Sequence, residues 1–196
     1  MPKIILITHQ KGGVGKSTLC FNLAQNISRS AKVAVIDFDL QGSLSQLSEM
    51  VVDFDIISYE ENKIDITKLE YDFIFLDTPP YLSNYLDELI KLSDLIIVPT
   101  KAGILDLLAV KNTIELIEEN DCKDKILIVF NMIKANTTLT LDILIEMEEY
   151  NVNIAKTHVS DLVAFTRSVV MQGVVQDKNA QKQIDNLSRE VLTRLI

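Results

Sequence analysis

The sequence predicts an α/β protein with a doubly wound, mostly parallel sheet that helices flank on both faces. Short runs that are nearly continuous in Ile, Val, Leu and Phe recur along the chain, and stretches with helical spacing of apolar residues separate most of them. Strands covered on both faces have such continuous runs, and regular alternation with helices implies parallel pairing through right-handed crossovers. A Gly-rich loop follows the first run, at the carboxyl edge of the sheet where such folds bind ligands.

The expected strands share high β-branched content and lie between polar or Gly-containing segments. They are Ile4–Thr8, Lys32–Asp37, Tyr71–Asp77, Leu95–Pro99, Ile126–Asn131 and Asn153–Thr157. Residues 51–70 give the weakest pattern. There, Phe54–Ser58 is a candidate short strand and Glu60–Lys63 a solvated turn.

The expected helices have apolar residues at intervals of three and four. They are Ser17–Ser30, Leu105–Glu119, Leu139–Tyr150 and Asp177–Leu195. In the first, Leu19, Leu23 and Ile27 recur on one face. Each helix therefore presents an apolar stripe that can cover one face of the sheet.

The composition is that of a folded cytoplasmic protein. With 196 residues and 47% hydrophobic side chains, we predict one domain over residues 1–196. The N-terminus leads directly into a strand-like run rather than the apolar segment of a signal peptide. No apolar run approaches the roughly 20 residues that span a membrane. Cys20 and Cys122 form no C-x-x-C pair, so we expect reduced packing residues and no metal site of that type.

The net charge of −9 is unevenly distributed. Residues 51–150 carry 8 Lys and Arg against 21 Asp and Glu, whereas residues 151–196 carry 6 against 4. An acidic middle repels nucleic acid. A DNA-binding surface is therefore expected to be local and to use mainly the C-terminal fifth of the chain.

The loop between the first strand and the first helix has the features of a phosphate site. It consists of Gly12, Gly13, Val14 and Gly15. Its glycines let backbone N–H groups turn around an anion, and the following helix N-terminus adds partial positive charge. We expect Lys16 to reach the β- and γ-phosphates of a nucleotide, Ser17 to ligate Mg²⁺ and Thr18 to bond the α-phosphate. The alternative is a strand–helix turn without a ligand, but two lysines and two hydroxyl groups beside it have no packing purpose.

The stretch K-G-G-V-G-K-S-T at 11–18 resembles the deviant Walker A motif of the ParA/MinD family of P-loop ATPases. Gln10 replaces the first glycine of the common P-loop pattern, and Lys11 matches the family's signature lysine. The resemblance implies that Lys11 reaches across a dimer interface to the phosphates held by the partner subunit, as a second cation near the transferring group. It also implies ATP and Mg²⁺ as cofactors and a homodimer that forms with ATP and separates after hydrolysis.

The stretch from Val35 to Ser43 resembles the family's switch I motif D-x-D-P-Q-G-[NS], with Leu40 in place of the usual proline. The resemblance implies that Asp39 orients the attacking water. It also implies that Asp37 supports the Mg²⁺ site through its water shell. The alternative is an Asp/Gln-rich turn that caps a helix beginning at Ser43.

Further strand ends match the same family. Phe73–Pro80 resembles the D-x-P-P of switch II, which implies that Asp77 holds Mg²⁺ directly or through water; a plain strand end with a capping Asp is the alternative. Ile128–Met132 resembles the strand that ends in an Asn near the adenine, which gives Asn131 a contact with the base, although Asn is common at strand ends. Pro99-Thr100 either follows the family pattern or simply terminates its strand.

The chain resembles the small ParA type found on plasmids and mobile elements, because only ten residues precede the motif and no helix-turn-helix arm is expected. The closing stretch from Phe165 to Val191 is similar to the family's helix, short strand and helix. The resemblance implies plasmid or chromosome partitioning, nonspecific DNA binding by the ATP-bound dimer, a separate centromere-binding adaptor protein and a cytoplasmic, nucleoid-associated location. Candidate DNA contacts are Lys156, His158, Arg167, Lys178, Lys182, Arg189 and Arg194. A scatter of solvated charges is the alternative.

A membrane-associated positioning ATPase of the MinD type is the rival function. Such proteins end in an amphipathic helix that lies on lipid, and Ile184–Ile196 has an apolar face. Because Asp185 and Glu190 interrupt its basic side and no aromatic residue follows, we expect a core-packed last helix and no stable membrane association. Paired cysteines of a metal carrier or reductase are absent from the sequence, and the signature lysine disfavours a small-molecule synthetase.

Overall fold

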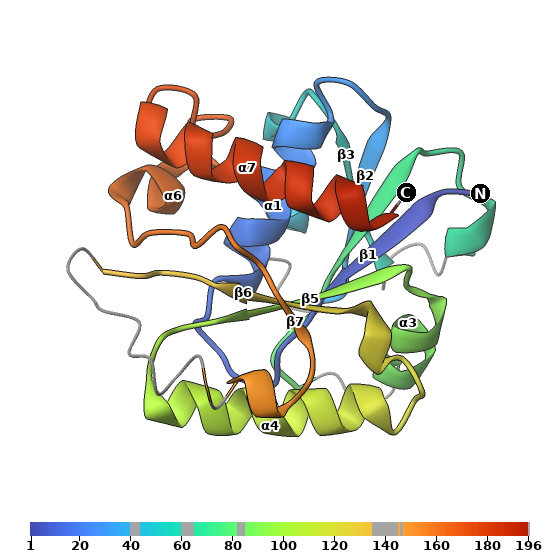
Figure 1. Cartoon of the computed structure of the whole chain (residues 1–196). Helices are drawn as coiled ribbons and strands as arrows, with labels where there is room; N and C mark the ends of the chain where they lie inside the picture. Colours follow the sequence, from blue (N-terminus) through green and yellow to red (C-terminus); the bar gives the residue numbers. More distant parts are fainter. Residues whose placement is uncertain (40–43, 60–64, 82–84, 135–144, 146, 196) are drawn as a thin grey trace.

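Seven strands form one sheet in which every pairing is parallel, in the order β3-β2-β4-β1-β5-β6-β7 (Figure 1). The computed structural model describes residues 1–39, 44–59, 65–81, 85–134, 145 and 147–195. The strands are β1 (Lys3–Ile7), β2 (Val33–Asp37), β3 (Asp55–Ser58), β4 (Phe73–Asp77), β5 (Leu95–Thr100), β6 (Ile126–Phe130) and β7 (Asn153–Ile154). The predicted fold class is confirmed, and the candidate strand at Phe54–Ser58 is real.

Helices cover both faces of this sheet (Figure 1). The α-helices are α1 (Lys16–Ile27), α3 (Leu86–Leu92), α4 (Ile104–Glu118), α6 (Val163–Arg167) and α7 (Lys178–Leu195). The described residues also contain the short 3₁₀ helices η1 (Ser45–Met50), η2 (Ile66–Lys68) and η3 (Lys123–Lys125). In Figure 1, α1, α6 and α7 lie above the sheet, whereas α3 and α4 lie below it.

Alternate residues of the central strand β1 face the two layers of helices. Ile5 and Ile7 belong to the core beneath α1 and α7, while Ile4 and Leu6 belong to the core above α3 and α4. All four side chains are buried. Burial on both faces explains why the strands read as continuous apolar runs rather than as alternating ones.

The last helix is packed into the core, as predicted. Ile184, Leu187, Val191 and Leu195 follow one another at intervals of three and four and are buried in the same core as α1. Among the described residues, no helix has the length and the apolar character needed to cross a bilayer.

Strand β7 is shorter than the expected Asn153–Thr157. The backbone N–H groups of Lys156 and Thr157 donate to the Glu190 carboxylate of α7, each at a distance of 2.8 Å, instead of to a neighbouring strand. The chain therefore departs from β6 after Ala155, whose N–H still donates to the Ile128 carbonyl, and returns to it at Val159, whose N–H donates to the Phe130 carbonyl.

The closing region also differs from the expected pattern. The predicted short strand between the last two helices is wrong, because the described residues 168–177 form turns and Gly173 has a φ of +110°. Helix α3 was not expected, since its seven residues are too few for a clear period. The helix expected over Leu139–Tyr150 falls largely outside the described residues, and so does the turn at Glu60–Lys63.

Candidate active site

The register of the sheet brings the predicted acidic residues to one edge. Asp77, at the end of β4, pairs with Asp37 of β2 on one side and with Ile7 of β1 on the other. Because β1 continues into the glycine loop, the carboxyl ends of three adjacent strands meet at this loop. This is the edge at which open α/β sheets bind ligands.

The loop before α1 has a backbone that requires glycine at two positions. Gly13 and Gly15 have φ values of +70° and +87°. A Cβ atom at Gly15 would also collide with the side-chain nitrogen of Asn131. That nitrogen donates to the carbonyl oxygen of Val14 over 2.8 Å. In this structure Asn131 therefore fastens the loop to the end of β6, and its contact with a base stays a prediction.

A hollow of about 240 Å³ lies over the loop and brings together parts that are far apart in sequence. It is lined by Gly12, Gly13, Gly15, Lys16, Ser17, Thr18, Asp39, Thr78, Pro79 and Pro80. The candidate water-orienting Asp39 thus shares one cavity with the phosphate loop and the Pro-Pro turn. Glycine backbone, an ammonium group and two hydroxyl groups around one small hollow form an anion site.

Lys16 is turned back onto the loop. Its side chain is buried, and its ammonium group donates to the carbonyl oxygen of Lys11 at a distance of 3.2 Å. Burial lowers the pKa of Lys16, whereas the negative charges of Asp77 and Asp39 raise it. A buried cation with one weak carbonyl partner is prepared to exchange that partner for a phosphate.

Lys11 is held within its own chain. Its ammonium group lies 2.6 Å from the Asp106 carboxylate, in the first turn of α4. The Asp106 side chain is 12% exposed and that of Lys11 is 36% exposed. Asp106 could not be selected from the sequence, because a single acidic residue in a first helical turn is ordinary dipole compensation.

Asp77 has the surroundings of a metal ligand. It is fully buried, and among the described residues no group forms a hydrogen bond of good geometry with either carboxylate oxygen, although the Ser17 hydroxyl lies close enough to lower its pKa. Burial raises its pKa to about 7, with Ser17 and Lys16 acting in the opposite direction and the nearby carboxylates in the same one. An unpartnered carboxylate beside a P-loop hydroxyl fits Mg²⁺. Among the described residues no three His, Cys, Asp or Glu side chains gather to hold a metal alone, so phosphate and water oxygens would complete the coordination.

Asp37 organises the switch I loop. One of its oxygens accepts a hydrogen bond from the Asp39 N–H at 2.9 Å. The other oxygen accepts from the N–H of Leu44 and from both the N–H and the hydroxyl of Ser45. Its carboxylate therefore holds both ends of the segment 40–43, which itself lies outside the described residues. Its contact with the metal's water shell remains a prediction.

His9 connects the loop to α4. Its Nδ1 lies 2.9 Å from the Thr113 hydroxyl, which donates to the Ala109 carbonyl and must therefore accept from His9. The proton is thus on Nδ1, and the buried Nε2 has no partner among the residues that the structure describes. Burial lowers the His9 pKa to about 4, and the Lys16 charge adds to this, so the ring is neutral at pH 7.

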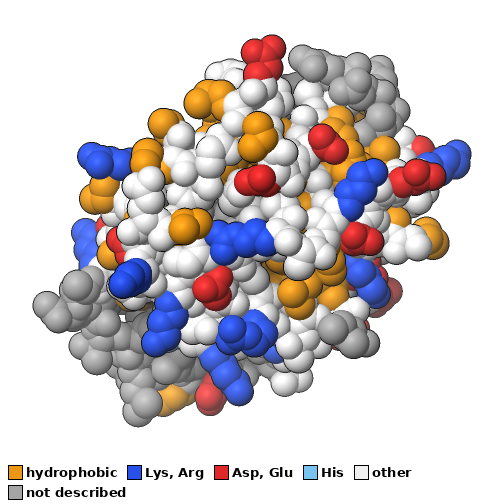
Figure 2. Space-filling model, turned by 90° about the horizontal axis from the view of Figure 1, so that it is seen from above, with side chains coloured by type: hydrophobic (Ala, Val, Ile, Leu, Met, Phe, Trp, Pro, Cys, Tyr) orange, Lys and Arg blue, Asp and Glu red, His pale blue; other side chains and the backbone are white. Residues whose placement is uncertain are grey.

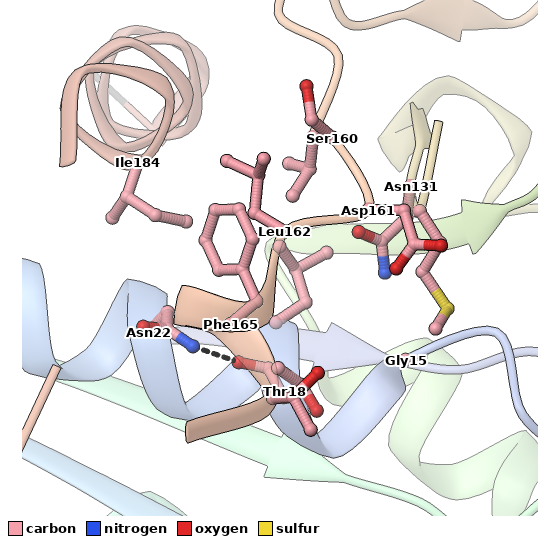
Figure 3. A pocket seen from close by; sticks show the side chains of 13 residues that line it. Gly15, Thr18, Asn22, Asn131, Ser160, Asp161, Leu162, Phe165 and Ile184 are labelled. Carbon is pink, nitrogen blue, oxygen red and sulfur yellow. Dashed lines mark hydrogen bonds between the residues drawn. The ribbon is translucent and has the colours of Figure 1, made fainter. Parts of the chain in front are cut away.

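A second hollow of about 230 Å³ adjoins the phosphate site (Figure 3). Its residues come from α1, the ends of β6 and β7, α6 and α7: Gly15, Thr18, Leu19, Asn22, Asn131, Met132, Val159, Ser160, Asp161, Leu162, Phe165, Thr166 and Ile184. In Figure 3, Asn131 and Asp161 lie beside each other on one side of the hollow, and Leu162 and Phe165 form its apolar wall. A cavity with both apolar and polar side chains beside the phosphate loop has room and chemistry for the nucleoside part of a nucleotide. Of its residues, the sequence pointed to Gly15, Thr18 and Asn131.

The predicted DNA contacts are all exposed, but they differ in the charges that surround them. Lys178, Lys182 and Arg189 lie on one face of α7, with Asp185 between them. Figure 2, which looks onto the face carrying α7, shows basic side chains mixed with acidic and hydrophobic ones. Burial lowers the pKa of His158, which packs edge-on against Phe130, so His158 adds little positive charge at neutral pH.

Lys156 and two arginines of α7, Arg189 and Arg194, line a shallow hollow of about 470 Å³. Glu190 belongs to the same hollow, but its carboxylate is engaged by the backbone of Lys156 and Thr157. This hollow therefore gathers three of the predicted contacts in one place.

The chain is similar to several known nucleotide-binding proteins. A family profile described as "CobQ/CobB/MinD/ParA nucleotide binding domain" matches residues 5–172. The maintenance of carboxysome distribution protein A of Halothiobacillus neapolitanus is 25% identical over 96% of this chain and 95% of its own. A plasmid partition protein of Borrelia burgdorferi bound to AMPPNP superposes over the full length of both chains with a TM-score of 0.77 and 21% identity. The cell division protein MinD of Aquifex aeolicus superposes over 97% of both, with a TM-score of 0.77 and 18% identity.

Proposed function

The chain belongs to the CobQ/CobB/MinD/ParA family of nucleotide-binding domains, and we propose that it is an ATP-dependent dimerisation switch of the ParA type. In this proposal it hydrolyses ATP to ADP and phosphate and uses the cycle to partition a plasmid, a chromosome or another cargo. One observation carries the proposal: a single hollow collects the phosphate loop, Asp39 and the Pro-Pro turn.

The site supports binding and hydrolysis in separate ways. Lys16 leaves the Lys11 carbonyl for the β- and γ-phosphates, and the loop N–H groups surround the same oxygens. Asp39 orients the attacking water. Ser17 and Asp77 would hold Mg²⁺, which neutralises phosphate charge when bound. No strong base is involved, so turnover is slow until charge on the transferring group is offset.

Lys11 acts in the dimer. It exchanges the Asp106 carboxylate of its own chain for the phosphates bound by a second copy. Exposed Leu105 and Leu108 flank Asp106 on α4, at 74% and 55% exposure, and offer apolar surface to that copy. Formation of this dimer therefore depends on ATP and ends with its hydrolysis.

The partners are nonspecific DNA and a separate centromere-binding adaptor, in the cytoplasm or on the nucleoid. The hollow formed by Lys156, Arg189 and Arg194 is the favoured phosphate-backbone contact. A MinD-like membrane role is the alternative. The buried apolar face of α7 speaks against it, because that face is occupied by the protein core.

Nucleotide assays test the ATPase. A fluorescent ATP analogue should bind to the wild type and to Lys11→Ala but not to Lys16→Ala. Phosphate release should be lost in Lys11→Ala and in Lys16→Ala, and it should be slowed in Asp39→Ala. Lys111→Ala, on the exposed face of α4, is the matched control and should behave as wild type. Tight binding of the analogue to Lys16→Ala would sink the P-loop assignment.

A salt series tests the DNA partner. The ATP-bound protein should retain a labelled nonspecific duplex at low salt and release it as salt rises, because counterions compete for phosphate. Arg189→Ala should weaken binding at every sequence tested, whereas Arg29→Ala, outside this hollow, should not. Salt-independent binding, or none, would redirect the search to lipid or protein cargo.

A further inference from the structure

Three aromatic side chains contact one another in a row at the edge of the sheet that holds the phosphate loop. The rings of Phe38 and Tyr59 are stacked, with centroids 4.4 Å apart and an angle of 26° between their planes. The Tyr85 ring meets that of Tyr59 edge-on, with centroids 5.5 Å apart and an angle of 65°. Stacked and edge-to-face contacts are the favoured arrangements of aromatic rings, so the three side chains restrain one another.

This aromatic stack joins the ends of two strands to the start of a helix. Phe38 directly follows β2, Tyr59 directly follows β3, and Tyr85 directly precedes α3. Strands β2 and β3 are parallel neighbours, so their carboxyl ends lie at the same edge of the sheet (Figure 1). Phe38 and Tyr59 pack into the core on the side that carries α3 and α4.

Phe38 is the residue immediately before Asp39, the proposed water-orienting acid. Its ring is buried in the core, whereas Asp39 lines the phosphate hollow. The Phe38 N–H donates to the Asp77 carbonyl at 2.9 Å, and the Asp39 N–H donates to the Asp37 carboxylate at 2.9 Å. Two hydrogen bonds thus hold the backbone here, and the ring contacts hold the Phe38 side chain. Together they set the direction in which Asp39 points from the end of β2.

We propose that the aromatic stack positions Asp39 for the hydrolytic step, with Tyr59 as the positioning residue that keeps Phe38 in place. Tyr59 does not line the phosphate hollow as the described residues define it, so it acts through Phe38 rather than on the nucleotide. The inference rests on the proposed function, in which Asp39 orients the attacking water. It adds to that function a residue that lies outside the phosphate loop and both switch motifs.

The stack should affect the rate of hydrolysis and not the affinity for ATP. The phosphate loop and Lys16 hold the nucleotide, whereas the orientation of the water counts only in the transition state. A misplacement of about 1 Å in a reacting group can lower a rate roughly 100-fold. Because the two backbone hydrogen bonds remain when the Tyr59 ring is removed, we expect a smaller loss, of about tenfold.

Single-turnover hydrolysis of radiolabelled ATP, followed over hours, tests the proposal beside binding of the fluorescent analogue. Tyr59→Leu should lower the rate about tenfold with its affinity for the analogue unchanged, and Tyr59→Phe should restore the wild-type rate. Tyr85→Leu, which removes only the outer ring, should give a smaller loss of rate. Tyr71→Leu is the matched control, because Tyr71 packs against the same core but precedes β4, at the opposite edge of the sheet. It should lower the melting temperature and leave the rate unchanged.

A double variant tests whether the stack acts through Asp39. Addition of Tyr59→Leu to Asp39→Ala should not slow hydrolysis further, because the group that the stack positions is already absent.

Several results would overturn the inference. They are rate losses that multiply in the double variant, unchanged rates in both Tyr59→Leu and Tyr85→Leu, or a loss in Tyr59→Phe or Tyr71→Leu equal to that in Tyr59→Leu. A wild-type rate in Asp39→Ala would instead refute the role of Asp39 on which the inference rests. Failure of the wild type to bind the analogue would refute the ATPase switch itself.

Discussion

Removal of the Asp106 charge should make the ATP-bound dimer tighter. In the structure the Lys11 ammonium group is 2.6 Å from the Asp106 carboxylate, and the proposed dimer needs that ammonium group at the partner's phosphates. The salt bridge therefore competes with dimerisation. Asp106→Asn keeps the shape of the side chain and removes the charge that retains Lys11.

The magnitude follows from burial. A hydrogen bond between charged groups contributes about 1.5–3 kcal/mol when well shielded, and an exposed ion pair about 0–1 kcal/mol. Asp106 is mostly buried but Lys11 is 36% exposed, so we take about 1 kcal/mol for each protomer. Two protomers give about 2 kcal/mol, which lowers the dimer dissociation constant roughly 30-fold.

Analytical ultracentrifugation in the Asp39→Ala background, with ATP present, measures this constant without interference from hydrolysis. Glu115→Gln is the matched control, because Glu115 lies on the same helix and pairs with Lys111 at 3.9 Å, away from the site. The control should leave the dimer unchanged. An unchanged or weaker dimer in Asp106→Asn, with normal ATP binding, would refute the competition between the two partners of Lys11.

Three further predictions concern the phosphate loop. His9 has a pKa of about 4 in the folded chain, so the unfolded chain takes up a proton first as pH falls below 6.5. The contribution of His9 to the free energy of unfolding should therefore be complete above pH 6.5 and fall by up to about 3 kcal/mol by pH 4. Urea titrations at several pH values should show this fall in the wild type and a smaller one in His9→Asn. Gly15→Ala should lower affinity for the ATP analogue at least tenfold, because it strains a φ of +87° and displaces the Asn131 amide; unchanged affinity would contradict this. Asn131→Ala should cost about 1–3 kcal/mol in thermal or urea unfolding, since it leaves the Val14 carbonyl unpaired. Equal loss of affinity for ATP and GTP would identify Asn131 as a clamp, and unequal loss as a base reader.

The sequence was most informative where backbone chemistry limits the choice of residue. Gly13 and Gly15 sit at positive φ beside Lys16, and few residue types fit that loop, so its position and chemistry could be predicted. The strands were equally clear, because burial on both faces leaves a continuous apolar pattern. Asp37 and Asp77 were selected because each ends such a strand within a stretch that resembles a motif of the family.

Other parts of the site leave little trace in the sequence. Asp106 acts through its distance to Lys11, which the fold sets across 95 residues. Asp161 and Phe165 line the second hollow, but they lie beyond the predicted strand at Asn153–Thr157, in a segment whose sequence carries no recognisable ligand-binding pattern. The end of β7 depends on the Glu190 carboxylate of α7, a tertiary contact that strand propensity does not contain.

Light scattering on Asp39→Ala tests the central claim most directly. With ATP the protein should have twice its mass of 22.1 kDa, and with ADP it should be a monomer. Adding Lys11→Ala should give a monomer with ATP although the nucleotide still binds. A protein that stays monomeric with ATP, or that dimerises equally well without Lys11, would contradict the ATP-dependent switch in which Lys11 acts on the partner's nucleotide.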